Sequence, residues 1–163
     1  MSATANQALV RTFFDAVWNQ GDETILDNLL APRSGRSIAT RLSRDTAYIR
    51  ANVRILRAAF PDWRVTIEEM IAMPDRVLTR WCAEGTHLGS FMGFAPTGRR
   101  ISATGISIFY ITGGRIQDAR VSRDSLSMLR QVCAGLSKGP TAQRAISTVT
   151  DGEQGEALAL GGG

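Results

Sequence analysis

The sequence has 163 residues, of which 44% are hydrophobic and 21% are charged, proportions that are ordinary for a globular domain. No run approaches the roughly 20 consecutive apolar residues of a membrane-spanning helix, and the first residues lack the basic-then-apolar order of a secretory signal. We therefore expect a cytoplasmic single-domain protein that does not associate with membranes.

The net charge of +4 comes from 18 arginines, one lysine and 15 acidic residues. The arginines are scattered, Arg99 and Arg100 form the only adjacent pair, and no expected helix carries a basic stripe with interleaved aromatics. These features argue against a nucleic-acid partner.

Cys82 and Cys133 lie in apolar segments, on an expected strand and an expected helix, and are interpreted as two buried free thiols.

The first half of the chain predicts three helices. Ala5–Gln20 repeats apolar residues at helical spacing, and Gly21 ends it before a second helix, Glu23–Leu30, that Asp22 can cap. The segment Ala31–Thr40 is rich in Pro, Gly and Ser and could form part of a cavity mouth.

Asp45 can cap the third helix, which continues to Phe60 and stops at Pro61. From Trp63 onward the apolar period changes to two, which predicts strands. A first strand is marked by Val65, Ile67 and Met70, and the following strands cover Arg76–Thr86, Ile101–Ile111 and Arg115–Arg123, with a hairpin turn at Gly113 and Gly114. Asp124–Val132 closes the pattern as a short helix.

This order of helices and strands predicts an α+β fold in which helices close one face of a curved antiparallel sheet around a pocket. Thr86–Arg100 is an apolar loop with three glycines that crosses between two of the strands. From Ser137 onward the chain is rich in Gly, Ser, Thr and Ala. We expect a domain over residues 1–135 and a flexible tail over residues 136–163.

Four segments, Phe13–Asp22, Phe60–Val65, Gly85–Arg100 and Gly114–Asp118, occur in an order that closely resembles the SnoaL-like polyketide cyclases of the NTF2-like superfamily. The resemblance covers about Ala5–Gly135. It implies a cone-shaped α+β barrel, in which a curved antiparallel sheet is wrapped by N-terminal helices around an apolar pocket. It also implies a homodimer or homotetramer.

The resemblance further implies closure of a ring in a polyketide-type substrate by intramolecular aldol condensation, with neither a metal nor an organic cofactor. In that family an aspartate just after the last strand takes a proton from the substrate, and the matching residue is Asp124. Gly105 and Ser107 stand where ring-closing members tend to place a glutamine and a histidine, and Ala119 stands where many relatives have a histidine.

Two interpretations of Asp124 stay open from the residues alone. Burial in an apolar pocket would make it a stronger base toward a carbon acid, whereas its position before Ser125 also suits a helix N-cap. If the strand persists, Asp118 and Arg120 share a face with Asp124. Arg120, with Ser107, could hold an oxyanion, or it could form a structural pair with an aspartate at the barrel rim.

His87 is the only histidine, which argues against a metal site built from protein ligands. It could bind a substrate oxygen or bond to a nearby loop. Aromatic residues that could stack on a polycyclic ligand, or fill the core instead, include Phe14, Trp18, Trp81, Phe91 and Phe94. Phe91 and Phe94 are favoured for the pocket because they lie in a loop.

The leading hypothesis is a cofactor-independent cyclase of secondary metabolism with Asp124 as its general base. One alternative is a pocket that folds a reactive substrate into a closing conformation, where proximity supplies most of the acceleration, or a hydroxylase of the same fold. Another is a binding protein that carries or senses a hydrophobic ligand without catalysis.

Overall fold

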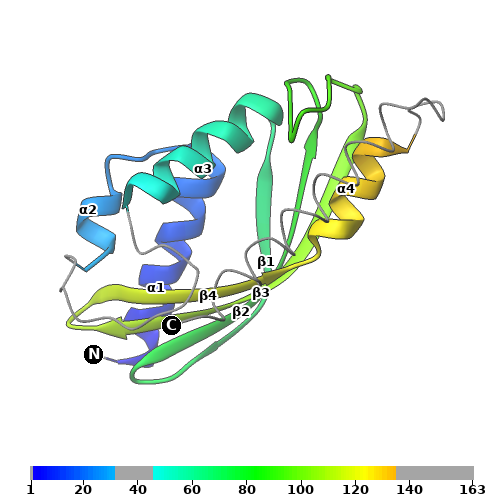
Figure 1. Ribbon diagram of the computed structural model, residues 1–163. Coiled ribbons are helices and arrows are strands. Elements are labelled where there is room, and N and C mark those ends of the chain that lie inside the picture. The colour runs from blue at the N-terminus through cyan, green and yellow to red at the C-terminus, as the bar shows by residue number, and fades with distance from the viewer. Residues whose placement is uncertain (1, 32–45, 135–163) are drawn as a thin grey trace, which may run out of the picture.

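The computed structural model describes residues 2–31 and 46–134 and confirms the predicted α+β fold with a curved antiparallel sheet. Figure 1 shows the helices α1 (Ala3–Thr12) and α3 (Thr46–Ala59) on one side of the sheet, and α4 (Ser125–Cys133) packed along its far end. The predicted tail at 136–163, the capping role of Asp45 and most of the loop at 31–40 lie outside the described residues.

The predicted first helix is two helices in series. After α1 the backbone continues as a π-helix, η1 (Phe13–Gln20), which ends at Gly21 in a left-handed conformation with φ of 74°. A π-helix has a wider turn than an α-helix, which brings residues five apart to one side. The Phe13 and Trp18 rings accordingly lie 6.5 Å apart, edge to face. The wider turn directs several aromatic side chains of η1 toward the sheet.

The second helix, α2 (Leu26–Leu29), is shorter than predicted. Asp22 does not cap it, because its carboxylate Oδ1 accepts hydrogen bonds from the Thr24 backbone N at 2.9 Å and from the Thr24 hydroxyl at 2.6 Å. These bonds hold the backbone in a local turn that competes with a helix. They also lower the pKa of Asp22.

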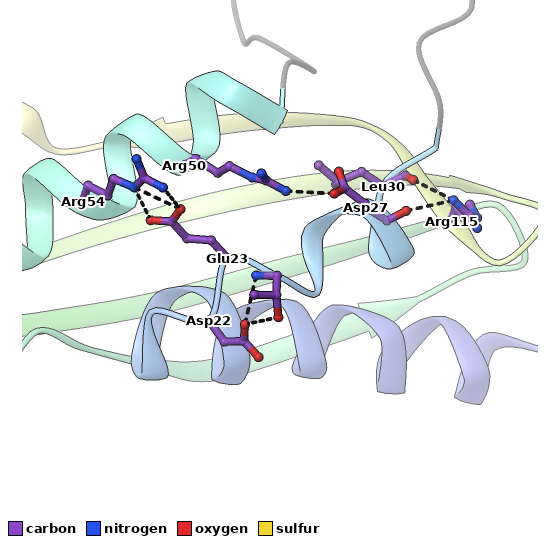
Figure 2. Close-up of polar contacts among 8 residues, drawn as sticks. Asp22, Glu23, Asp27, Leu30, Arg50, Arg54 and Arg115 are labelled. Carbon is purple, nitrogen blue, oxygen red and sulfur yellow. Dashed lines mark hydrogen bonds and ion pairs between the residues drawn. The ribbon is translucent and has the colours of Figure 1, made fainter.

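Polar contacts tie α2 to its neighbours, as Figure 2 shows. Arg54 of α3 pairs with Glu23 and Arg50 pairs with Asp27, while Arg115 donates to the backbone oxygens of Asp27 and Leu30. Exposed ion pairs of this kind contribute only about 0.2–1 kcal/mol each. Their main consequence is geometric, since they fix α2 between α3 and the edge of the sheet.

The four strands form a meander, with each strand hydrogen-bonded to the next one along the chain. Their bounds are β1 (Arg64–Ala72), β2 (Arg76–Thr86), β3 (Arg100–Thr112) and β4 (Arg115–Arg123). The predicted hairpin turn is confirmed, since Gly113 and Gly114 both have positive φ, 58° and 76°. Two consecutive positive φ values are what a tight type I′ hairpin needs, and glycine adopts them without strain.

The register of the sheet decides which side chains face the helices. Ser107 of β3 stands between Thr79 of β2 and Val121 of β4, and this row lies on the helix-covered inner face. The next row, with Ile108 between Leu78 and Arg120, belongs to the outer face, because successive residues of a strand point to opposite sides.

No helix within residues 2–31 and 46–134 has the length and apolar character needed to cross a lipid bilayer.

Cys82 on β2 and Cys133 on α4 are free thiols, as predicted, although both are half-buried instead of fully buried. Partial burial raises the pKa of each thiol. A raised pKa disfavours the reactive thiolate, so neither cysteine has the character of a nucleophile.

Candidate functional site: an apolar cavity on the inner face of the sheet

A cavity of about 450 Å³ lies between the N-terminal helices, the inner face of the sheet and the start of α4. This volume falls in the range of small-molecule sites. Its wall is mostly aromatic and aliphatic, and most of its polar groups come from β4. The lining residues are Phe13, Phe14, Trp18, Leu30, Ala31, Tyr48, Ile49, Asn52, Leu56, Trp63, Val65, Trp81, Ser107, Phe109, Ile116, Gln117, Asp118, Ala119, Val121, Ser122, Arg123, Ser125 and Met128.

Aromatic side chains of η1 and the sheet build one wall. Phe13 and Phe14 each meet Phe109 edge to face, with ring centroids 5.6 Å and 5.7 Å apart. The structure places three of the predicted stacking residues at the cavity: Phe14, Trp18 and Trp81. Phe14 and Trp81 are also part of the buried core, so core packing and cavity lining are not exclusive for them.

Trp81 and Ser107 form a buried polar pair in the cavity wall. Trp81 Nε1 donates to Ser107 Oγ over 2.9 Å, and the two residues are 7% and 2% exposed. Ser107 therefore contributes a buried hydroxyl to the cavity wall. Its observed partner is an indole, instead of the arginine that was predicted to act with it.

The β4 side of the cavity is polar. Asp118 lines it and accepts a hydrogen bond from the Ala119 backbone N at 3.0 Å. Arg123 also lines it and pairs with Gly105 in the ladder, which places Arg123 on the same face as Ser107. The sequence analysis missed Arg123. Alternation along β4 separates Val121 and Arg123 from Arg120, but the register with β3 is needed to show which of the two faces is covered.

Asp124 is the N-cap of α4. Its Oδ1 accepts from the Ser127 backbone N at 2.8 Å, and its own N–H donates to the Thr104 oxygen. The residue is exposed and does not line the cavity, although the flanking Arg123 and Ser125 do. The capping interpretation thus describes the observed contacts, and the carboxylate lies outside the apolar enclosure that the base hypothesis expected.

Arg120 lies on the opposite face of the sheet from Ser107. Its ladder partner is Ile108, whereas Ser107 pairs with Val121. The guanidinium stacks over the Tyr110 ring at 5.8 Å from the centroid, and Arg120 is absent from the cavity wall. The predicted cooperation of Arg120 and Ser107 at one oxyanion is therefore not present in this structure.

His87, Phe91 and Phe94 do not reach the cavity. His87 is fully buried, stacks on Phe60 with centroids 5.3 Å apart, and shares a hydrogen bond of 3.1 Å between its Nδ1 and Thr97 Oγ1. Phe91 packs edge-on against Phe60 at 5.1 Å. Phe60, His87 and Phe91 form what we call the crossover cluster, in which the three rings pack against one another. Burial lowers the pKa of His87 and so favours its neutral form.

The sequence analysis also missed the contribution of α3, where Tyr48, Ile49 and Asn52 line the cavity. Tyr48 and Asn52 are four residues apart and therefore share one face of the helix. Tyr48 directly precedes Ile49, the first residue of the apolar face predicted for this helix, and this neighbouring aromatic was the available signal. Within residues 2–31 and 46–134, no group of three or more His, Cys, Asp or Glu side chains is arranged to hold a metal ion.

A curved antiparallel sheet with N-terminal helices around an apolar cavity places the protein in the NTF2-like class of α+β folds. The chain matches the family described as SnoaL-like polyketide cyclase over residues 8–132, which is most of its length. It belongs to the SnoaL-like polyketide cyclase family, as the four sequence segments indicated.

Solved structures share this fold over nearly their whole length. TsrD from Streptomyces laurentii is 27% identical with a TM-score of 0.71, over 82% of this chain and 98% of that chain. A proposed polyketide cyclase from Acidithiobacillus ferrooxidans is 28% identical with a TM-score of 0.69, over 82% and 99%. IdmH from Streptomyces antibioticus, another proposed polyketide cyclase, is 27% identical with a TM-score of 0.65, over 78% and 97%. No curated protein matches the chain.

Proposed function

We propose that this protein is a cofactor-independent cyclase that binds an apolar polyketide-type intermediate in the cavity and closes a ring within it. The observation that carries the proposal is the aromatic-lined cavity of about 450 Å³, with Ser107 buried in its wall, in a chain that belongs to this family. Holding two parts of one flexible substrate together is itself a large source of rate acceleration.

The proposed reaction is an intramolecular aldol addition. A carboxylate takes a proton from a carbon that lies between two carbonyl groups, and the resulting enolate carbon forms a bond to the carbon of a third carbonyl group in the same molecule. The electron pair of that carbonyl moves to its oxygen, which then takes up a proton and becomes a hydroxyl. Atoms and charge balance without any further reagent, and proton transfer by a positioned carboxylate contributes about 10²–10⁴-fold.

Asp124 is the proposed base, on the family resemblance and on its place between two residues that line the cavity, Arg123 and Ser125. The cap bond engages only Oδ1, so Oδ2 is the oxygen that would take the proton. Asp118 is the second candidate, since it lines the cavity itself. The exposure of Asp124 favours two alternatives. In one, the shape of the cavity supplies most of the rate acceleration, and in the other the protein carries the ligand without catalysis.

The sharpest test uses Asp124→Asn, because asparagine caps a helix about as well as aspartate but cannot act as a base. Turnover is followed by the absorbance of a synthetic β-diketone that carries a third carbonyl group and closes a ring onto it by intramolecular aldol addition. We expect ring closure to fall by about 100-fold or more, with an unchanged midpoint of urea unfolding. Asp118→Asn is the matched variant of the other carboxylate.

Each outcome assigns the role differently. Turnover that survives in Asp124→Asn and is lost in Asp118→Asn transfers the base to Asp118. Turnover that survives in both variants favours closure driven by shape. A wild-type protein that binds the diketone and never closes its ring is a ligand carrier.

We also propose that the protein is a homodimer or homotetramer, with a second copy on the outer face of the sheet. That face exposes apolar side chains, including Ile106 at 51% and Ile71 at 51% exposure, flanked by Leu78 and Ile108. An exposed apolar patch of this kind is typical of an interface between subunits. Sedimentation equilibrium tests the proposal, and a monomer at micromolar concentration would contradict it.

A further inference from the structure

The hydrogen bond between Trp81 and Ser107 has only one possible direction. An indole N–H donates and never accepts, so the Ser107 oxygen must be the acceptor of the 2.9 Å contact. A serine hydroxyl has one proton to donate as well as two lone pairs. The bond from Trp81 therefore uses one lone pair of Ser107 and leaves its proton for another acceptor.

No protein group takes that proton in the part of the chain that the structure describes. Thr79 is the ladder partner of Ser107 on the same buried face, yet its Oγ1 is buried without a hydrogen-bond partner, so it does not accept from Ser107. Among residues 2–31 and 46–134, the contact from Trp81 is the one hydrogen bond found for Ser107 Oγ. Because Ser107 lines the cavity, the remaining acceptor is expected from a bound molecule.

Gly105 makes the pair possible. A Cβ atom at this position would lie 2.4 Å from Trp81 Cζ2 and 2.8 Å from the Ser122 backbone oxygen. Any larger residue would thus push the indole away from Ser107. The Trp81 ring therefore occupies the space that a side chain at position 105 would need.

We propose that the Trp81–Ser107 pair is a recognition site for a carbonyl oxygen on an apolar, ring-bearing ligand. Ser107 donates its proton to an oxygen that only accepts, as in a ketone or quinone, and Trp81 is a positioning residue that holds the hydroxyl in place. The inference rests on the proposed function and deepens it, because it names the substrate carbonyl that the cavity polarises during ring closure.

The test compares two rigid tricyclic molecules that differ by one carbonyl group, 9-fluorenone and fluorene. Calorimetric titration of the wild-type protein should show fluorenone binding on the order of tenfold tighter, which corresponds to one buried hydrogen bond. The infrared carbonyl band of bound fluorenone should lie below its frequency in an apolar solvent, since a hydrogen bond weakens the C=O bond.

Three variants separate recognition from packing. Ser107→Ala should remove both the preference and the infrared shift, while fluorene affinity stays within about twofold. Trp81→Phe keeps an aromatic ring but loses the N–H, so fluorenone affinity and the infrared shift should both fall, without abolition of either. Thr79→Val is the matched control: it removes a neighbouring buried hydroxyl that does not line the cavity, and the preference should not change.

Equal affinity of the wild-type protein for the two tricyclic molecules, with no shift of the carbonyl band, overturns the inference, as does the absence of binding by both. The proposed reaction fails separately. A fluorenone preference that depends on Ser107, in a protein that never closes the diketone, keeps the carbonyl site and removes the cyclase. If Ser107→Ala closes the ring as fast as the wild type does, and the wild type shows no preference for fluorenone, the cyclase is kept and the carbonyl site is removed.

Discussion

Two aromatic regions of this protein look alike in sequence and differ in structure. The cavity wall places Phe14, Trp18 and Trp81 around an open volume of about 450 Å³. In the crossover cluster His87 stacks on Phe60 and Phe91 packs edge-on against it, and none of the three lines the cavity. The difference lies in the surroundings of the rings: those of the crossover cluster do not border the cavity, whereas those of the cavity wall contact one another and also border its open volume.

The largest expected effect contrasts the two regions in stability. Phe60→Ala removes a fully buried ring that contacts Trp63, His87 and Phe91, and should lower the free energy of unfolding by about 3–5 kcal/mol. Trp18→Ala truncates a half-buried residue beside existing open space, so its loss should be smaller. Urea unfolding measures both, and fluorenone titration should show the larger loss of affinity for Trp18→Ala.

Similar losses of stability in the two variants would contradict this contrast. So would a larger loss of ligand affinity in Phe60→Ala at a temperature where both variants remain folded. Either result would mean that the crossover cluster, and not the cavity wall, carries the ligand contacts.

A smaller expected effect is a pH dependence of stability that arises from His87 in the crossover cluster and not from the cavity wall. Burial lowers its pKa in the folded protein below the ordinary value of 6.5. The unfolded chain therefore binds more protons in the window just below pH 6.5, and stability falls as the pH drops through that window toward the folded pKa. Well above pH 6.5 both states are neutral at this residue and the contribution is constant.

The measurement is urea unfolding at pH 7.5 and pH 6.0 for wild type and for His87→Phe, which keeps an aromatic ring against Phe60. The wild type should lose more stability than the variant, because the variant lacks the titrating group. Ligand affinity of the wild type should change little over this range, since His87 does not line the cavity. An equal pH dependence in the two proteins would contradict the account of the crossover cluster.

The sequence predicted the parts of the fold that depend on local pattern. The strands Arg76–Thr86 and Arg115–Arg123 have the predicted bounds, and the turn at Gly113 and Gly114 follows from the backbone freedom of glycine. Of the predicted site residues, Phe14, Trp18, Trp81, Ser107 and Asp118 do line the cavity. Helical and strand spacing marked Phe14, Trp18 and Trp81 as core or stacking residues, whereas Ser107 was singled out by its place in the family resemblance.

The sequence could not show where the crossover loop folds. Gly89 lies so close to α3 that a Cβ atom there would be 2.1 Å from the Ala58 backbone oxygen, and His87 and Phe91, on either side of it in the chain, pack against Phe60. The face of β4 was likewise undetermined, because parity assigns Arg120 and Arg123 to opposite sides without saying which side is covered. Register with β3 was needed to identify Arg123 as the arginine at the cavity.

One measurement tests most directly whether the cavity is the ligand site. All three tryptophans, Trp18, Trp63 and Trp81, line the cavity, so their indole N–H signals report on it in a two-dimensional ¹H–¹⁵N NMR spectrum. Addition of 9-fluorenone should shift all three indole signals, with the largest change at Trp81. Unchanged indole signals, together with shifts confined to the backbone amides of residues 87–94, would show that the ligand binds at the crossover loop and would contradict the account.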